Sequence, residues 1–258
     1  MPQAFFAPSG GRLEPAPHAR SWWVPSMTHG RLLGGLLARA LEAEQGAEGM
    51  RFTRLTVDLF RSAPLAPLEV ATTRIRDGHR IRVTEATVHS GDGVFAKATA
   101  VQLREGEQPP DPAPATPPWD APGPETMAPH RVGATPERWH LEGRRTWVRE
   151  TCELVEGEPM SPFVRAALAA DTASPLAHAG EKELEFINAD YSLYLSRMPE
   201  GEHIGVAAGG HSSGEGIAVG HCTLHDARGP IGYCMTAAVA NPGVRPNTRP
   251  RARRGSSV

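Results

Sequence analysis

Long apolar segments are missing from this sequence of 258 residues. No window approaches the roughly 18 consecutive apolar residues that a membrane-spanning helix needs. The start, MPQAFFAPSGGRLEP, lacks the basic residues followed by an apolar stretch that mark a secretory signal peptide. We therefore expect no membrane partner and a cytoplasmic location.

Cysteine is also scarce, and its pattern excludes two kinds of site. The three residues Cys152, Cys222 and Cys234 are odd in number and lack metal-type spacing. They are predicted to be buried, reduced thiols. The histidines are scattered, without a carboxylate at metal-ligand spacing, so no metal and no cofactor is predicted. A G-x-S-x-G nucleophile elbow is absent, which argues against a serine hydrolase of that kind.

Neither sign of charge dominates, because 27 basic and 29 acidic residues give a formal net charge of −2. This balance gives no reason to expect a nucleic-acid partner. The exception is the segment 241–258, which contains five arginines, no acid and few large apolar residues. We expect it to be a basic disordered tail.

Proline is abundant in one place, GEQPPDPAPATPPWDAPGPETMAP, which starts at residue 106. Proline fixes φ and removes a backbone donor, so this stretch cannot form a helix or a central strand. It divides the chain into an N-terminal unit (1–105), a linker (106–130) and a C-terminal unit (131–240).

Each unit has the same order of predicted elements, a helix followed by β-rich runs. The segment 28–44, THGRLLGGLLARALEAE, has leucines at helical spacing. Partly alternating, β-branched runs follow at 51–60, 68–76, 79–90 and 94–105. In the second unit a helix is predicted over 159–171, and strands over 144–155, 182–197, 202–210, 216–226 and 229–240.

A fixed offset of 136 residues superposes the two units. It places Arg61 on Arg197 and Gly93 on Gly229, so the arginine and the glycine are equally far apart in both. The pattern predicts an α+β fold made by duplication, with one helix on an antiparallel sheet in each unit.

These segments resemble the thioesterase-like superfamily, and within it the type II acyl-CoA thioesterase group. The resemblance rests on THGRLLGGLLARALE, AADTASPL, NADYSLYLSR and the β-rich runs, and covers roughly residues 20–240. It implies a double hotdog, two tandem helix-on-sheet units forming one continuous structure. It also implies a substrate thioester at the seam between the units.

The resemblance further implies a catalytic set. The family's helix aspartate matches Asp171, and its threonine position is taken by Asn188. The glutamine position falls at Thr236 or the neighbouring Ala237. A buried carboxylate has a raised pKa and can serve as a general base. Alternatively, Asp171 is a surface residue at a helix end enforced by Pro175.

Further site residues are expected at the start of the first helix. His29 is a candidate neutral base, or else a capping residue. Gly30 would permit close approach of substrate, and Arg31 would face a phosphate or solvent. Tyr191 and Arg197, both in NADYSLYLSR, are also predicted to bind substrate.

Three functions stay open at this point. The first is hydrolysis of an acyl-CoA or acyl-carrier-protein thioester by Asp-assisted attack of water. The second is conjugate addition of an amine or water to an α,β-unsaturated thioester in specialised metabolism. The third is acyl binding without catalysis. A homodimer is expected, because exposed strand edges tend to pair.

Overall fold

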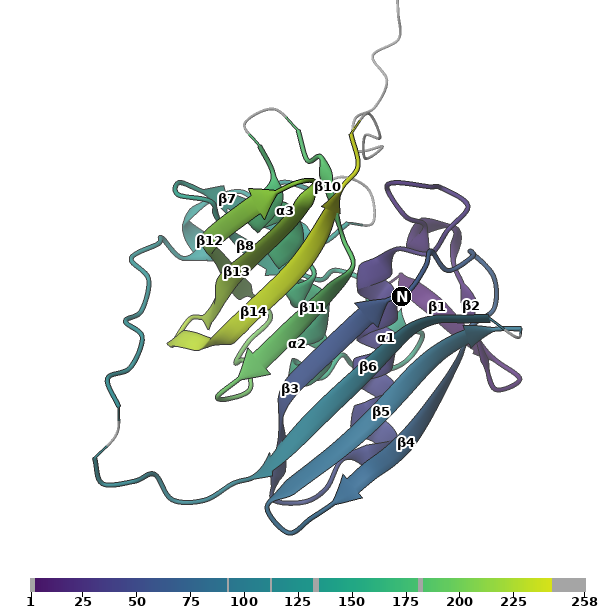
Figure 1. Ribbon diagram of the computed structural model, residues 1–258, viewed down its shortest axis with the longest axis horizontal. Coiled ribbons are helices and arrows are strands. Elements are labelled where there is room, and N and C mark those ends of the chain that lie inside the picture. The colour runs from purple at the N-terminus through teal and green to yellow at the C-terminus, as the bar shows by residue number, and fades with distance from the viewer. Residues whose placement is uncertain (1–2, 92, 112, 132–134, 181–182, 243–258) are drawn as a thin grey trace, which may run out of the picture.

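Both units contribute strands to one large antiparallel sheet (Figure 1). The computed structural model describes residues 3–91, 93–111, 113–131, 135–180 and 183–242. Along the sheet the strands follow the order β4-β5-β6-β3-β11-β14-β13-β12-β8-β7, and β10 also pairs with β14. This confirms the predicted α+β double hotdog. The predicted tail lies almost entirely outside the described residues.

The N-terminal unit wraps four long strands around one helix. Helix α1 extends over Gly30–Gln45. The strands are β3 (Met50–Leu59), β4 (Glu69–Asp77), β5 (Ile81–Ser90) and β6 (Gly93–Arg104). The alternating sequences of β3, β5 and β6 place one side of each of these strands in the core, whereas the edge strand β4 is mostly exposed. The predicted ranges of all four hold to within two residues.

The C-terminal unit repeats this plan with a shorter helix. Helix α2 extends over Pro162–Ala170 and the separate helix α3 over Ala173–His178. The strands are β7 (Glu137–Leu141), β8 (Arg145–Arg149), β10 (Phe186–Asn188), β11 (Asp190–Leu195), β12 (Ile204–Gly214), β13 (Ile217–Asp226) and β14 (Gly229–Ala240).

A two-fold relation between the units appears at the junction of β3 and β11. The two strands are antiparallel, and Thr56 pairs with Ser192, its own equivalent at the offset of 136. Their hydroxyl oxygens lie 3.0 Å apart. Two-fold symmetry places such a pair of equivalent residues on its axis, so the fold supports the predicted duplication.

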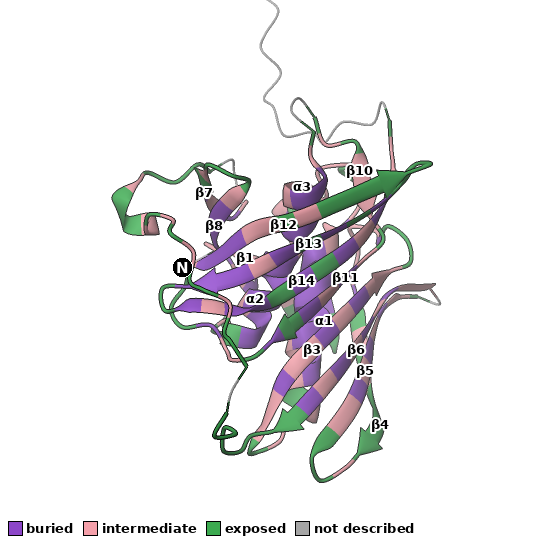
Figure 2. Cartoon of the chain, turned by 60° about the vertical axis from the view of Figure 1, so that its left-hand side comes forward, coloured by how far each residue is buried: buried purple, intermediate pink, exposed green. Residues whose placement is uncertain are grey.

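The helices pack against each other behind the sheet, where most of their residues are buried (Figure 2). Gly34 and Gly35 of α1 allow this close approach. A Cβ on Gly34 would overlap the Tyr191 hydroxyl, and one on Gly35 would lie 2.7 Å from Leu168 Cδ2. Gly35 therefore lets α1 cross α2 at short range, and Gly34 leaves room for the Tyr191 side chain from β11.

The proline-rich segment is pinned to the C-terminal unit by aromatic contacts. Apart from a short 3₁₀ turn at Pro124–Thr126, its described residues form neither helix nor strand. Trp119 stacks on His225, with ring centroids 4.6 Å apart, and meets Trp147 edge-on at 4.7 Å. The segment thus connects the two units and also packs against the surface of the C-terminal unit.

A second sheet was not predicted. It pairs β1 (Ala4–Ser9) with β2 (Arg12–Pro15) and with β9 (Glu153–Val155), and so ties the N-terminus to the C-terminal unit. The three cysteines are free and buried, as expected. No helix in the described part of the chain is long and apolar enough to cross a membrane.

Candidate active site

Asp171 lies where the helix of the C-terminal unit is interrupted. Ser161 caps the start of α2 by accepting from the N–H of Val164 at 3.1 Å, and Pro162 follows it. Pro175 has no N–H for the carbonyl of Asp171, and its ring would clash with that carbonyl in a continuous helix. Helix α2 therefore ends at Ala170, with Asp171 as its C-cap.

Asn188 reaches this carboxylate from β10. Its side-chain Nδ2 donates to Asp171 Oδ1 at 3.2 Å. Burial raises the pKa of Asp171, and this effect exceeds the lowering by the Asn188 hydrogen bond and by the charges of Arg31 and Arg138. Of the predicted catalytic residues, the structure thus brings Asp171 and Asn188 into direct contact.

His29 caps the start of α1. Its Nδ1 accepts from the N–H of Arg31 at 3.3 Å, so the neutral ring carries its proton on Nε2. The ring meets Trp22 edge-on at 4.8 Å. Burial, together with Arg31 and Arg138, holds its pKa well below the usual value, so the imidazole is neutral at physiological pH.

Arg31 neither faces solvent nor is free for a phosphate, contrary to both expectations. Its guanidinium forms an ion pair with Glu150, and the two side chains are only 6% and 5% exposed. Gly30 is in close packing, since a Cβ there would lie 3.3 Å from Leu59 Cδ1. A buried charge needs a partner, and Glu150 supplies it for Arg31.

Thr236 is buried but uses its hydroxyl elsewhere. It donates to the carbonyl of Asp190 at 2.9 Å, and it is 4% exposed. The next residue, Ala237, donates its backbone N–H to Asp190 Oδ1 at 2.7 Å. In the described structure, neither position gives the Asp171 carboxylate a side-chain hydrogen bond.

Tyr191 holds the two helices together and is not available for substrate. It is 1% exposed, and its hydroxyl donates to the carbonyl of Ala167 in α2 at 3.1 Å. The ring end lies against Gly34 of α1. This packing gives Tyr191 a structural role instead of the predicted substrate contact.

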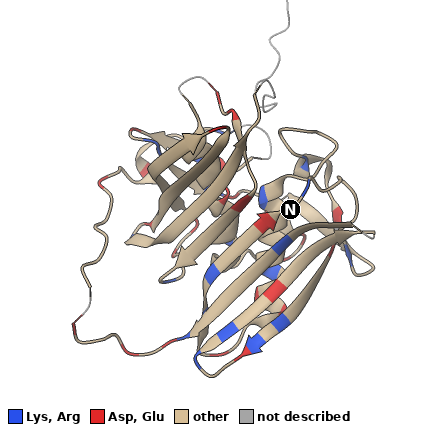
Figure 3. Cartoon of the chain, viewed as in Figure 1, with Lys and Arg blue, Asp and Glu red and all other residues tan. Residues whose placement is uncertain are grey.

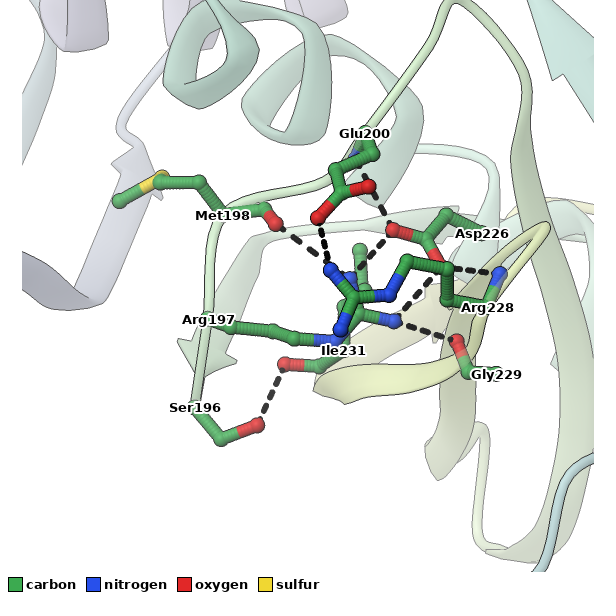
Figure 4. Close-up of polar contacts among 8 residues, drawn as sticks. All are labelled: Ser196, Arg197, Met198, Glu200, Asp226, Arg228, Gly229 and Ile231. Atoms are coloured by element: carbon green, nitrogen blue, oxygen red, sulfur yellow. Dashed lines mark hydrogen bonds and ion pairs between the residues drawn. The ribbon is translucent and has the colours of Figure 1, made fainter.

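Arg197 likewise has a structural role in place of the predicted one (Figure 4). Its guanidinium forms a two-pronged ion pair with Asp226 and donates to the carbonyl of Gly229 at 3.1 Å. Burial alone would raise the pKa of Asp226. Hydrogen bonds from Arg197 and from the N–H groups of Glu200 and Arg228 outweigh it, so the net pKa is lowered.

Two residues near the site had no signal in the sequence. Glu150 follows β8, and Arg138 lies on β7 with its guanidinium 5.0 Å from the ring centroid of Trp22. Burial and the charge of Arg31 lower the pKa of Arg138 to about 10, against the raising effect of Glu150 and Asp171. The described residues contain no group of three or more side chains suited to a metal ion.

Family models match almost the whole folded part of the chain. Residues 19–103 match the N-terminal domain of acyl-CoA thioesterases, and residues 103–239 match their C-terminal domain. The chain belongs to the acyl-CoA thioesterase family. It is an acyl-CoA thioesterase-type hydrolase, and its substrate class is the acyl-CoA thioester.

Solved structures agree with this fold. A hotdog-fold protein of unknown function from Alicyclobacillus acidocaldarius has a TM-score of 0.64 and 15% identity, covering 91% of this chain and 94% of that one. A TesB protein of Mycobacterium avium subspecies paratuberculosis has a TM-score of 0.62 and 14% sequence identity, and the match covers 91% of this chain and 94% of that one. The acyl-CoA thioesterase II TesB2 of Mycobacterium marinum has a TM-score of 0.53 and 19% sequence identity, and the match covers 81% of this chain and 89% of that one. No curated protein matches the sequence.

Proposed function

We propose that this thioesterase hydrolyses acyl-CoA by attack of a water molecule that Asp171 deprotonates and Asn188 orients. The contact between Asn188 Nδ2 and Asp171 Oδ1, at the positions where the family resemblance expects its acid and its hydroxyl, carries the proposal. A carboxylate whose pKa is raised by burial is a stronger base than an ordinary aspartate.

Asn188 is suited to positioning water because its amide has two ends. A carboxylate only accepts hydrogen bonds, so the NH₂ group must face Asp171. The amide oxygen then remains free to accept from a water proton. One side chain can thereby fix both the base and its water, the task that a hydroxyl would otherwise perform.

The reaction needs no group outside the chain and the substrate. Water attacks the carbonyl carbon while its proton passes to Asp171, and the C=O electron pair moves onto oxygen. When that pair returns, the C–S bond breaks. The thiolate of CoA takes the proton from Asp171, which leaves a carboxylic acid and a thiol.

In this proposal His29 and Thr236 assist the reaction but do not act as the base. His29 is neutral, and its buried Nε2 proton has no partner among the described residues, so it can donate to substrate but cannot readily take a proton. Thr236 fixes Asp190, two residues from Asn188, through its hydroxyl. We therefore assign the base to Asp171 alone.

A homodimer is part of the proposal. Strand β4 ends the large sheet on one side, and most of its residues are exposed. A free strand edge can pair with that of a second copy. Light scattering is expected to give twice the chain mass of 27.6 kDa; a mass of 27.6 kDa would contradict the dimer.

The test of the hydrolysis measures release of free thiol from saturated and α,β-unsaturated acyl-CoAs. Asp171→Asn keeps the shape and removes the base, so we expect kcat to fall about 10³-fold. Glu42→Gln is the matched control, since burial raises the pKa of Glu42 too, but this residue lies near the far end of α1. It is expected to keep full activity.

The remaining outcomes separate the alternatives. Full thiol release by Asp171→Asn would reject Asp171 as the base. Loss of the enoyl chromophore without thiol release, when an amine is supplied, would indicate conjugate addition. No reaction with any substrate would leave acyl binding alone.

A further inference from the structure

Four buried polar atoms without a partner gather around the start of α1. They belong to His29 (Nε2), Arg31 (Nε), Arg138 (Nε) and Glu150 (Oε2), and none has a hydrogen bond to a described residue. Such atoms are rare in folded proteins, and each calls for an explanation. Several of them in one place can hold water or a polar group of a substrate.

This cluster lies beside Asp171. Helices α1 and α2 cross where Gly35 meets Leu168. Arg31 is about one turn from this crossing along α1, and Asp171 about one turn from it along α2. Arg138 faces the same helix start, because its guanidinium lies over Trp22 and the Trp22 ring meets His29, two residues before Arg31. The charges of both arginines lower the pKa of Asp171.

Arg138 differs from Arg31 in having no acid of its own. Arg31 is neutralised by Glu150. Among the described residues no carboxylate oxygen comes within 4.0 Å of the Arg138 guanidinium, although Asp171 and Glu150 both act on it. Arg138 is therefore the cation of the seam with hydrogen-bonding capacity left for substrate.

The position of Arg138 is fixed from two sides. Its backbone exchanges hydrogen bonds with His130 at 2.7 and 3.0 Å and pairs with Val148 of β8. Its guanidinium lies over Trp22, whose ring in turn meets His29 at the helix start. A charge held this firmly does not need to reorganise during a reaction.

We infer that Arg138 is a further catalytic residue, whose guanidinium donates to the thioester oxygen as that oxygen becomes an oxyanion. This inference rests on the proposed hydrolysis. When water attacks, the negative charge moves from Asp171 to the carbonyl oxygen. The buried Nε of Arg138 has no partner among the described residues before the attack, so a hydrogen bond to the oxyanion is gained only as the charge develops.

The site lacks one polar group at Thr236. The family resemblance expects a glutamine that orients the attacking water at this position, but the Thr236 hydroxyl is bound to the carbonyl of Asp190. An oxyanion donor is worth roughly 10²–10³ in kcat in other enzymes. A donor from Arg138, on a different strand, would therefore offset the loss of the orienting glutamine.

The test compares Arg138→Gln and Arg138→Lys with the wild type on a saturated acyl-CoA. We expect Arg138→Gln to lower kcat about 10²-fold with little change in KM, and Arg138→Lys to recover part of it. Arg54→Gln is the matched control. Its Nε is also buried without a partner among the described residues, but it lies in a groove of about 780 Å³ on the other sheet face, with Tyr194 and Tyr233.

Two further readouts exclude a purely structural role. Added guanidinium should restore part of the activity of Arg138→Ala, and none of that of Asp171→Asn. An S-alkyl-CoA thioether, which has no carbonyl oxygen, should bind wild type and Arg138→Gln equally. An unchanged kcat in Arg138→Gln would overturn the inference. So would a loss of activity that added guanidinium does not restore and that is accompanied by an equal loss of thioether binding.

Failure of the proposed function looks different. If Asp171→Asn stays fully active while Arg138→Gln is impaired, the base assignment is wrong and the role of Arg138 stands. If the wild type releases no thiol from any acyl-CoA, both are overturned.

Discussion

The helices of the two units show how one scaffold was adapted for chemistry. Helix α1 runs unbroken for 16 residues, whereas α2 ends after 9 residues and is followed by the separate helix α3 of 6 residues. At the offset of 136, Pro175 falls on Arg39, which is in the middle of α1. A proline in one copy thus turns a helix interior into a C-cap, and the C-cap residue is the acid.

The arginine shared by the two units differs in the same way. Arg61 is exposed, donates to the carbonyl of Val94 at 3.0 Å and lies over Phe95. Arg197 is held by the fully buried Asp226. The difference follows from one position, since Ser90 stands where Asp226 would superpose. The C-terminal unit therefore relies on a buried ion pair that the N-terminal unit lacks.

Charge is also distributed unequally between the units (Figure 3). Strands β12 and β14 contain no charged residue, whereas β3 and β4 contain several. A charged strand face suits solvent, and an uncharged one suits contact with another surface. The four strands β3–β6 and their counterparts β11–β14 thus share an order but differ in surface chemistry.

The largest expected effect on stability comes from placing a proline in α1 at the position that superposes on Pro175. Arg39→Pro would break α1 and is expected to lower the free energy of unfolding by about 3 kcal/mol or more. Arg39→Ala serves as control, because it removes only the half-exposed ion pair with Glu158, worth about 1 kcal/mol or less. Urea unfolding measures both. Equal losses would show that the helix break itself is harmless.

The second expected effect concerns the shared arginine. Arg197→Met leaves the buried Asp226 without its charge partner, which is expected to cost about 3 kcal/mol. Arg61→Met removes an exposed contact and is expected to cost less than about 1 kcal/mol. Thermal unfolding of the two variants gives the comparison. A loss of similar size at both positions would contradict the asymmetry.

The third tests the crossing of α1 and α2. Gly34→Ala would push the Tyr191 hydroxyl out of place and is expected to cost about 1–3 kcal/mol. Tyr191→Phe removes that hydroxyl together with its bond to Ala167, at about 1 kcal/mol. Because the clash disappears with the hydroxyl, the double variant should be more stable than the sum of the two losses predicts. Strict additivity would argue against the contact.

The sequence predicted the large sheet well because its strands are long and alternate. It missed β1, β2 and β7, which are short and gain their order by pairing with other strands, and it merged β8 and β9 into one strand over 144–155. It also extended the second helix only as far as Asp171, so α3 beyond it went unrecognised. The effect of Pro175 on the carbonyl of Asp171 is local, so the sequence alone indicates a helix end there.

The candidate site was predictable only where a motif marks it. The pairing of Asp171 with Asn188 follows from the family resemblance, and the structure brings them together. Arg138 and Glu150 stand alone in strand-like sequence, where a charged residue ordinarily faces water. Their burial arises because separate segments converge on the start of α1. No local sequence pattern predicts that separate segments will converge in this way.

The smallest expected effect is the dependence of stability on pH. Burial raises the pKa of Asp171 in the folded state above its unfolded value. The folded protein therefore loses stability as pH rises through this raised pKa. Asp171→Asn has no such ionisation, so its stability relative to wild type should increase from about pH 4 to about pH 8. An unchanged or decreasing difference would contradict the raised pKa.

The most direct test of Asp171 as the base is the pH dependence of kcat for a saturated acyl-CoA. The wild type should show one acid limb, at a pH above the usual pKa of an aspartate, below which activity falls tenfold per pH unit. Asn188→Ala removes a hydrogen bond that lowers the pKa of Asp171, so the limb should move to higher pH. An acid limb at the same pH in both proteins, or none, would contradict the account.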